Sequence, residues 1–205
     1  MAGRLRPPLR SCDIVAGIYD WIDRRGTVVS DSRRARRFGS FGDGSFIAHR
    51  PIALYNEHAI HIGAGTMIGP GVSLSAGMAP GQELISDRII SIGNGCLIGR
   101  HSSIVAHLEI VIDDDVFFGP NVYVTDQNHA LDDLGLAIGR QAAPERPVHI
   151  GAGSWIGTNA VVLPGVTIGR GVAVGAGAVV TTDLPDFAIA VGSPARVVRM
   201  RDELT

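Results

Sequence analysis

Aromatic residues are scarce in this sequence, since Phe, Tyr and Trp together supply 5% of its 205 residues. Ordinary globular cores take much of their bulk from such rings, so this scarcity argues against a conventional globule. Apolar residues nevertheless reach 45%, and the chain contains 27 glycines. A core of Ile and Val with glycine at regular intervals indicates narrow, repeated coils.

Net charge and cysteine are scarce as well. A net charge of −2 produces no overall field that would attract nucleic acid or an anionic membrane. The two cysteines, Cys12 and Cys96, have neither the spacing of a metal clip nor that of a disulfide framework. We therefore expect two reduced thiols in a cytoplasmic protein.

Long apolar runs are also missing. The most apolar stretch, residues 160–180, is interrupted by Pro164, Arg170 and five glycines, which fits a bilayer helix poorly. The basic N-terminal residues 1–11 lack the apolar region of a secretory signal. These features predict a protein without an integral membrane segment.

What the sequence does contain is a six-residue period of apolar side chains. Steps of six from four starting points reach 16 positions, all of them apolar, and nine are followed directly by glycine. An amphipathic helix would instead show spacings of three and four. The positions are Ile62, Ile68, Leu74, Ile92, Ile98, Ile104, Ile110, Ile112, Phe118, Val124, Ile150, Ile156, Val162, Ile168, Val174 and Val180.

A period of 18 is superimposed on the period of six, because every third hexad of the last block lacks its glycine. Three short strands per turn of a triangular coil explain both periods, since one aliphatic side chain per side would point inward. Corner positions require small residues or unusual φ angles, which favours glycine. The sequence therefore predicts an all-β fold, a three-sided parallel β-helix of roughly five coils stacked about 4.8 Å apart.

The hexads do not all stay in phase, so extra residues must bulge out of the coil. Ile62 and Ile92 are 30 residues apart, a multiple of six, whereas Ile112 and Ile150 are 38 apart. The clearest excursion is residues 130–147, which begins directly after His129. A loop of that length in a compact repeat is usually functional or disordered.

Helical spacing occurs in one place, where Ile14, Ile18 and Ile22 predict a short helix over about residues 12–25. A β-helix cannot bury its own ends, so we expect this helix to cap the first coil. Residues 183–205 would close the other end.

These patterns divide the chain into three parts. We predict an N-terminal helical extension over residues 1–45, a β-helix domain over residues 46–185 with the excursion loop at 130–147, and a C-terminal tail over residues 186–205.

Three segments carry a more specific resemblance. Residues 122–129 read Val-Tyr-Val-Thr-Asp-Gln-Asn-His, residues 148–157 read Val-His-Ile-Gly-Ala-Gly-Ser-Trp-Ile-Gly, and residues 191–196 read Val-Gly-Ser-Pro-Ala-Arg. From about residue 92 to residue 200 the chain resembles the hexapeptide-repeat acyltransferases. Within them it is most similar to the galactoside, maltose and nodulation-factor O-acetyltransferases and to the polysaccharide O-acetyltransferases. The resemblance implies a left-handed β-helix, a homotrimer with active sites between neighbouring prisms, and an acyl donor, usually acetyl-CoA.

The resemblance places His129 at the catalytic position. A free alcohol barely ionises at neutral pH, and an imidazole is suited to remove its proton. His129 would take that proton as the acceptor oxygen attacks the thioester, and would return it to the departing CoA thiolate. The backbone N–H of Thr158 matches the donor that stabilises the oxyanion.

Further residues match the donor site of these enzymes. Trp155 matches a position in its wall, and Ala176 and Thr181 match positions that line the pantetheine arm. Arg196 and Arg199 are suited to bind the phosphates of CoA through charge-assisted hydrogen bonds.

The acceptor side is less defined. Asn128 is a candidate acceptor contact, and Asp126 is a candidate to orient the imidazole of His129. In the resembling enzymes an Asn in the coil before the catalytic His also contacts the acceptor, and His107 and Glu109 lie near its expected place. We expect a small-molecule or saccharide acceptor, and nothing in the sequence identifies one hydroxyl.

The leading hypothesis is therefore an acyltransferase that moves acetyl from acetyl-CoA to a hydroxyl of a sugar or cell-surface saccharide. An N-acetyltransferase for an amino sugar, or a non-catalytic hexapeptide scaffold, remain as alternatives. No His pair has the five-residue spacing of the zinc-binding γ-class carbonic anhydrases, so we expect no metal. The arginines between residues 24 and 37 lack interleaved aromatic residues, so we expect a solvated linker and no nucleic acid partner.

Overall fold

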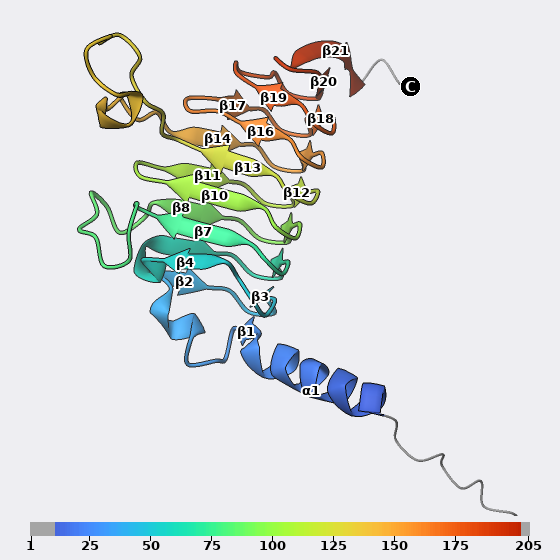
Figure 1. Ribbon diagram of the computed structural model, residues 1–205. Coiled ribbons are helices and arrows are strands. Elements are labelled where there is room, and N and C mark those ends of the chain that lie inside the picture. Colours follow the sequence, from blue (N-terminus) through green and yellow to red (C-terminus); the bar gives the residue numbers. More distant parts are fainter. Residues whose placement is uncertain (1–10, 202–205) are drawn as a thin grey trace, which may run out of the picture.

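The computed structural model describes residues 11–201, and their strands form the three sides of a left-handed β-helix, as the sequence predicted (Figure 1). The basic residues 1–10 and the last residues, 202–205, lie outside the described part of the chain. No helix within residues 11–201 is both long and apolar enough to cross a membrane.

Each side of the prism is one sheet of short strands. Sheet A contains β1 (Val28–Val29), β3 (Phe46–Ile47), β6 (Met67–Ile68), β9 (Leu97–Ile98), β12 (Phe117–Phe118), β15 (Trp155–Ile156), β18 (Ala173–Val174), β20 (Ala188–Val191) and β21 (Arg196–Met200). Sheet B contains β2 (Ser40–Phe41), β5 (Ile60–Ile62), β8 (Ile90–Ile92), β11 (Ile110–Ile112), β14 (Val148–Ile150) and β17 (Thr167–Ile168). Sheet C contains β4 (Ala53–Tyr55), β7 (Ser73–Ala76), β10 (Ser103–Ala106), β13 (Tyr123–Thr125), β16 (Val161–Val162) and β19 (Val179–Val180).

The chain passes from sheet B to sheet A to sheet C in every coil, and strands of one sheet pair in parallel with those of the next coil. Ile92 lies opposite Ile112, Ile112 opposite Ile150, and Ile150 opposite Ile168. The intervals of 20, 38 and 18 residues thus each correspond to one coil. Sheets B and C have six strands each, one coil more than the sequence suggested.

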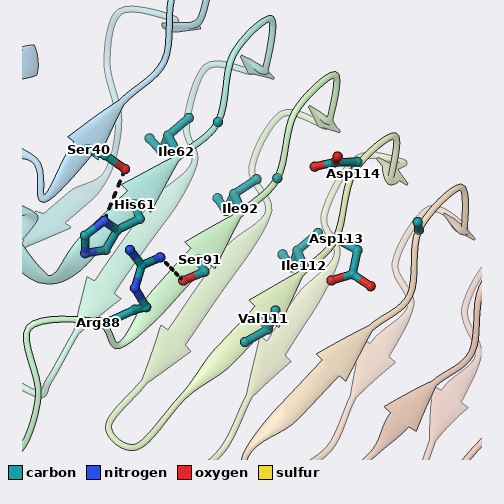
Figure 2. A pocket seen from close by; sticks show the side chains of 13 residues that line it. Ser40, His61, Ile62, Arg88, Ser91, Ile92, Val111, Ile112, Asp113 and Asp114 are labelled. Atoms are coloured by element: carbon teal, nitrogen blue, oxygen red, sulfur yellow. Dashed lines mark hydrogen bonds between the residues drawn. The ribbon is translucent and has the colours of Figure 1, made fainter.

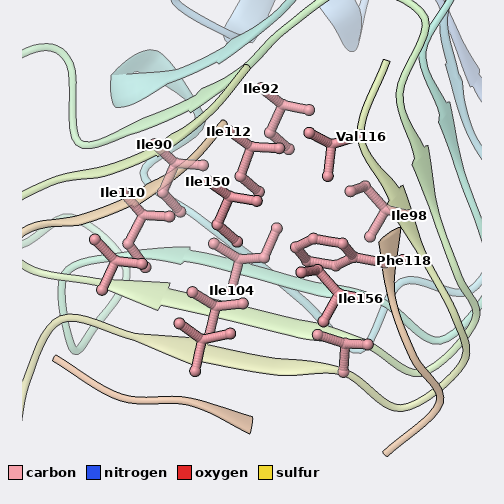
Figure 3. Packing of buried hydrophobic residues seen from close by; sticks show 14 of the residues in the cluster. Ile90, Ile92, Ile98, Ile104, Ile110, Ile112, Val116, Phe118, Ile150 and Ile156 are labelled. Atoms are coloured by element: carbon pink, nitrogen blue, oxygen red, sulfur yellow. The ribbon is translucent and has the colours of Figure 1, made fainter. Parts of the chain in front are cut away.

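The inward side chains form the core as stacked columns (Figure 3). Ile92, Ile112 and Ile150 are at most 3% exposed, and Phe118 is fully buried. Burial of one such side chain stabilises the folded state by about 1.5–3 kcal/mol. The inward aliphatic side chains of the predicted six-residue repeat therefore stabilise the prism.

The additional coil precedes the predicted repeat. Phe41 lies opposite Ile62, and Ile47 lies opposite Ile68. The step from Ile47 to the next inward residue, Leu54, is seven residues rather than six, so this coil escapes a search for hexads. The prism consequently begins near residue 40 rather than at residue 46.

Helix α1 (Ser11–Gly26) confirms the predicted N-terminal helix, but it does not cap the core. None of its residues is buried, and the side chains of Ile14, Ile18 and Trp21 are more than half exposed. It projects away from the first coil in Figure 1. Val28 and Phe38, which follow the helix, are buried against the core instead, together with Ala35 of the short 3₁₀ helix η1 (Ala35–Arg37).

The C-terminal residues extend the prism rather than forming a separate tail. β20 pairs in parallel with β18, and β21 folds back antiparallel to β20 at the end of sheet A. Ala188 and Ala190 of β20 are fully buried. The last coil is closed in this way, as expected of a terminal cap.

Candidate active site

Three irregularities of the coil meet at one corner, where the chain turns from sheet C to sheet B. Residues 77–89 connect β7 to β8, residues 107–109 connect β10 to β11, and residues 126–147 connect β13 to β14 and include the 3₁₀ helix η3 (Ile138–Arg140). The two long loops project from the same side of the prism in Figure 1. Stacking of successive coils therefore brings these three interruptions into one place.

Two adjoining hollows lie at this corner, and His129 and Asn128 line both. The lower hollow, about 240 Å³, is completed by residues from all three connections: Met78, His107, Gln127, Gly139, Arg140, Gln141, Ala142, Ala143 and Glu145. The upper hollow, about 260 Å³, is completed by Ala143, Pro144, Arg146, Leu163, Pro164 and Thr181. His129 thus lies between two spaces.

The imidazole of His129 is oriented by the loop that follows it. Its Nδ1 lies 3.3 Å from the backbone carbonyl oxygen of Gln141, and His129 and Ala142 form an antiparallel bridge. A carbonyl oxygen can only accept, so Nδ1 carries the proton of this hydrogen bond. Nε2 of the neutral ring is then unprotonated and available as a base.

Gln141 also fixes the loop itself. Its side-chain amide donates to the carbonyl oxygens of Asp133 and Leu136, and its Oε1 accepts from the N–H of Asp133. The residue is 8% exposed, so these hydrogen bonds are shielded from water. The loop therefore supports His129 through a fully bonded buried amide.

Asp126 has a different position from the one suggested by the sequence. It is fully buried, and its carboxylate accepts hydrogen bonds from the backbone N–H groups of His107, Leu108 and Glu109 at 2.7–3.0 Å. It makes no hydrogen bond to the His129 imidazole among the described contacts. The carboxylate shapes the neighbouring turn, because three convergent backbone donors already occupy its oxygens.

The lower hollow also contains a pair that sequence reasoning did not identify. Nδ1 of His107 lies 2.8 Å from Oε1 of Glu145, and the His107 side chain is 11% exposed. Its Nε2 is buried and has no hydrogen-bond partner. The two residues are 38 positions apart, and only the path of the excursion loop brings them together. The proximity of His107 to the expected acceptor contact was the one signal available.

Two of the predicted residues, Thr158 and Ala176, lie across sheet C from His129. Thr158 is at the corner before β16, whereas Leu163 and Pro164 of the upper hollow follow β16. Ala176 occupies the Thr158 corner one coil higher, with the Gly177 N–H bonded to the Thr158 carbonyl oxygen. Thr181 alone of the expected donor contacts lines a hollow with His129.

Trp155 belongs to an apolar column on the outer face of sheet A. Its side chain is about half exposed, as are those of Phe117 and Met67. Pairing places seven outward apolar residues in one line: Phe46, Met67, Leu97, Phe117, Trp155, Ala173 and Ile189. Arg196 and Arg199 are exposed on β21, at the upper end of this sheet.

A third hollow lies on the outer face of sheet B, and its histidine is not free to act on a substrate (Figure 2). His61 is bonded at both ring nitrogens, to Ser40 Oγ at 3.1 Å and to the carbonyl oxygen of Asp87 at 2.9 Å. Arg88 donates to Ser91 Oγ. These contacts fasten the end of the 77–89 connection to the first coils, and they leave His61 no free nitrogen for a substrate.

Among residues 11–201, the pKa values of the Cys96 thiol and the Asp114 carboxyl are shifted, and both groups lie away from His129. Burial raises the pKa of the Cys96 thiol. Hydrogen bonds from the backbone and side-chain amide of Asn94 lower the pKa of Asp114. Within residues 11–201, no three His, Cys, Asp or Glu side chains are grouped so as to hold a metal ion.

Two sequence profiles match the repeats. One, described as a bacterial transferase hexapeptide of six repeats, matches residues 147–182, and another, a hexapeptide repeat of succinyl-transferase, matches residues 89–126. A probable acetyltransferase of Mycobacterium tuberculosis is 43% identical over 109 residues, 53% of this chain and 36% of the relative. A galactoside O-acetyltransferase of Lactococcus lactis is 35% identical over 111 residues, 54% of this chain and 52% of the relative. The chain thus aligns with about a third to a half of the length of these relatives.

Solved structures share the fold. AntD, an N-acyltransferase from Bacillus cereus crystallised with dTDP and coenzyme A, superimposes with a TM-score of 0.69 at 23% identity, over 86% of this chain and 95% of AntD. A maltose O-acetyltransferase from Clostridium difficile gives a TM-score of 0.53 at 24% identity, over 92% of this chain and 84% of that protein. The expected resemblance to hexapeptide-repeat acyltransferases is confirmed by these matches.

Proposed function

Because this chain carries the hexapeptide repeats of the acyltransferases, we propose that it transfers an acetyl group from acetyl-CoA to a hydroxyl of a sugar or saccharide. The observation that carries the proposal is the hydrogen bonding and the position of the His129 imidazole. Its Nδ1 is committed to the Gln141 carbonyl, and its ring lies between two hollows. A base that is held in one tautomer between two substrate spaces is what a direct transfer requires.

The reaction proceeds without a covalent enzyme intermediate. The acceptor oxygen attacks the thioester carbonyl carbon while Nε2 of His129 takes the hydroxyl proton. The resulting tetrahedral oxyanion accepts a hydrogen bond from the Thr158 N–H. Collapse breaks the carbon–sulfur bond, and the imidazolium returns the proton to the thiolate, so that free CoA and the ester leave.

The residues that stabilise the oxyanion and those that supply the base belong to two copies of the chain. Thr158 and Trp155 lie across sheet C from His129, so one prism does not bring them together. A neighbouring prism would place its Trp155 corner against the His129 corner of the first. Three such contacts close a ring, which is the homotrimer expected of this fold.

The surface supports this assembly. The excursion loop exposes Leu131, Leu134 and Ile138, with exposed fractions of 65%, 98% and 55%. The outward column of sheet A exposes the complementary apolar side chains, with Phe117 and Trp155 at its centre. Exposed apolar patches of this kind mark contact surfaces. Here one copy would contribute the excursion loop, and its neighbour would contribute the outward column of sheet A.

The groups that would hold coenzyme A fit its chemistry. Ala176 and Thr181 are exposed, small side chains beside the upper coils, where a pantetheine arm requires space. Arg196 and Arg199 offer two exposed guanidinium groups at the same end of the prism for phosphates. Acetyl-CoA is an intracellular metabolite, so this function also places the protein in the cytoplasm.

Thiol release from acetyl-CoA tests the function, with glycosides and amino sugars as acceptors and a 42 Da mass gain as proof of transfer. We expect His129→Ala to lower kcat by about 10²–10⁴-fold, the usual contribution of a general base. His149→Ala is the matched control, because His149 pairs with Asp113 on the outer face of sheet B and lines neither hollow. A His129→Ala enzyme with wild-type turnover would refute the assignment, and transfer to amines alone would replace the O-acyl reaction by N-acylation.

A further inference from the structure

Helix α1 is joined to the prism along one of its sides. Oδ1 of Asp23 lies 2.9 Å from Nδ1 of His49 and 3.9 Å from Nε of Arg50. The Arg50 guanidinium also lies over the ring of Tyr19, 5.4 Å from its centroid. Tyr19 and Asp23 are four residues apart, so they share one side of the helix. These contacts with the corner that follows β3 fix the direction in which α1 leaves the prism (Figure 1).

The opposite side of α1 carries an exposed apolar stripe. Ile14, Ile18 and Trp21 follow one another at steps of four and three residues, and Arg25 continues the same line. The three apolar side chains are more than half exposed, although side chains of this size are usually turned toward a core. An apolar face that is held away from its own core indicates a contact surface.

The same end of the chain is basic. Residues 1–37 contain nine arginines and four aspartates, a net charge of +5, whereas residues 38–205 contain nine arginines and 16 acidic residues, a net charge of −7. The small net charge of the whole chain therefore hides a basic end and an acidic prism. The arginines of this end that the structure describes are all exposed: Arg24, Arg25, Arg33, Arg34, Arg36 and Arg37.

We propose that the N-terminal end of the prism docks on an anionic lipid bilayer, with the apolar stripe of α1 in the interface and the arginines on the lipid headgroups. Such a bilayer supplies both an apolar layer for the stripe and negative charge for the arginines. A nucleic acid would supply the charge but would leave the stripe in water. A bundle of α1 helices from several copies would bring each Arg25 against its equivalents, and these like charges repel one another.

The arrangement of side chains around α1 suits an interfacial helix. Tryptophan is enriched where a membrane meets water, and Trp21 lies in the stripe. The Arg25 guanidinium lies over the Trp21 ring, 5.3 Å from its centroid, and its apolar stem allows the charge to reach the headgroups. Asp20 and Asp23 lie on the other half of the helix, so their carboxylates are kept away from the lipid.

Co-sedimentation of the full chain with lipid vesicles tests the docking. The vesicles contain either phosphatidylcholine alone or equal parts of phosphatidylcholine and phosphatidylglycerol. We expect the protein to sediment with the anionic vesicles at about 0.1 M salt. Binding should be weaker by about 10-fold or more on phosphatidylcholine alone, and also on the anionic vesicles at about 1 M salt. Equal binding to the two kinds of vesicle would contradict the role of the arginines.

Two variants separate the apolar and the basic contributions. Ile18→Asp places a charge in the stripe and should lower binding to the anionic vesicles by about 10-fold or more. The triple variant Arg33→Gln, Arg34→Gln and Arg36→Gln should lower it by about 100-fold. Ile85→Asp is the matched control, because Ile85 is an exposed apolar residue of the 77–89 connection, and it should bind as the wild type does. Circular dichroism checks that each variant is folded. Wild-type binding by Ile18→Asp would refute the proposal.

Tryptophan fluorescence identifies the docked surface. In a Trp155→Phe chain Trp21 is the remaining tryptophan, and brominated lipid in the anionic vesicles should quench it. Binding without quenching of Trp21 would mean that another surface docks, and would overturn the proposal.

Failure to sediment with anionic vesicles would overturn it as well. The stripe would then belong to a second copy if the lipid-free protein self-associates and Ile18→Asp abolishes this association. The arginines would belong to a nucleic acid site if the protein binds a single-stranded RNA oligonucleotide instead. All of these readouts are independent of acetyl transfer, so the docking and the proposed function stand or fall separately.

Discussion

Asp126 shows how a single residue organises this corner. A carboxylate three positions before a histidine invites the hypothesis of an orienting contact, and the sequence suggested one. The structure directs the carboxylate to three backbone donors of another coil instead. The sequence could not reveal this, because the two segments are one coil apart. Likewise the contact between His107 and Glu145 depends on the path of a loop that obeys no repeat.

Replacement of Asp126 by alanine should be strongly destabilising. Three buried N–H groups would lose their acceptor, and we expect a loss of about 3–5 kcal/mol in the free energy of unfolding. Urea denaturation followed by circular dichroism measures it. Asp113→Asn is the matched control, since Asp113 forms an exposed pair with His149 worth at most about 1 kcal/mol. Equal stability losses in the two variants would contradict this role of Asp126.

The two cysteines should differ in reactivity. Burial raises the pKa of the Cys96 thiol, so less of it is ionised near neutral pH, and the thiolate is the reactive form. Cys12 is exposed. Iodoacetamide at neutral pH should therefore label Cys12 in the native protein and Cys96 only after denaturation, as read by mass spectrometry. Labelling of both at the same rate would argue against the buried position.

At the scale of elements, the repeat was predictable and its interruptions were predictable only in part. Inward columns follow directly from the six-step spacing. The excursion at 130–147 was visible because its length breaks the phase. The 77–89 connection was not visible in the same way. Its coil spans 30 residues, and the twelve residues beyond the usual 18 are a multiple of six, so they leave the repeat in phase. The predicted capping role of α1 was wrong, because amphipathic spacing predicts a helix but does not identify the surface against which it packs.

The excursion loop should depend on Gln141 for its catalytic effect. Gln141→Ala removes the three hydrogen bonds that hold Asp133 and Leu136, so the loop should exchange amide hydrogens faster. We expect kcat to fall by about 10-fold or more, because a poorly held base loses its alignment. Hydrogen exchange and steady-state kinetics measure both effects. Glu83→Ala, in the other long loop and lining neither hollow, should change neither, and an unaltered kcat in Gln141→Ala would separate the loop from catalysis.

At the scale of the whole molecule, the fold separates two groups that the proposed mechanism requires in one site. A prism with three flat sides exposes His129 at one edge of sheet C and Thr158 at the other. Sequence reasoning placed both in one active site through the resemblance alone. A rigid column cannot bend to bring its own edges together. In the proposed mechanism a second copy of the chain would therefore complete the site.

Mixed trimers test this claim most directly. His129→Ala removes the base from one edge, and Thr158→Pro removes the N–H donor from the other. Each variant alone should be nearly inactive. Random co-assembly of equal amounts should restore about a quarter of the wild-type activity, because one heterologous contact in four would join two intact halves.

The measurement is thiol release from acetyl-CoA by the co-expressed variants, with each variant first shown to form trimers by sedimentation. Recovery near one quarter is the predicted result. A mixture as inactive as its components, at full trimer assembly, would show that the two residues do not meet across copies and would contradict the shared site.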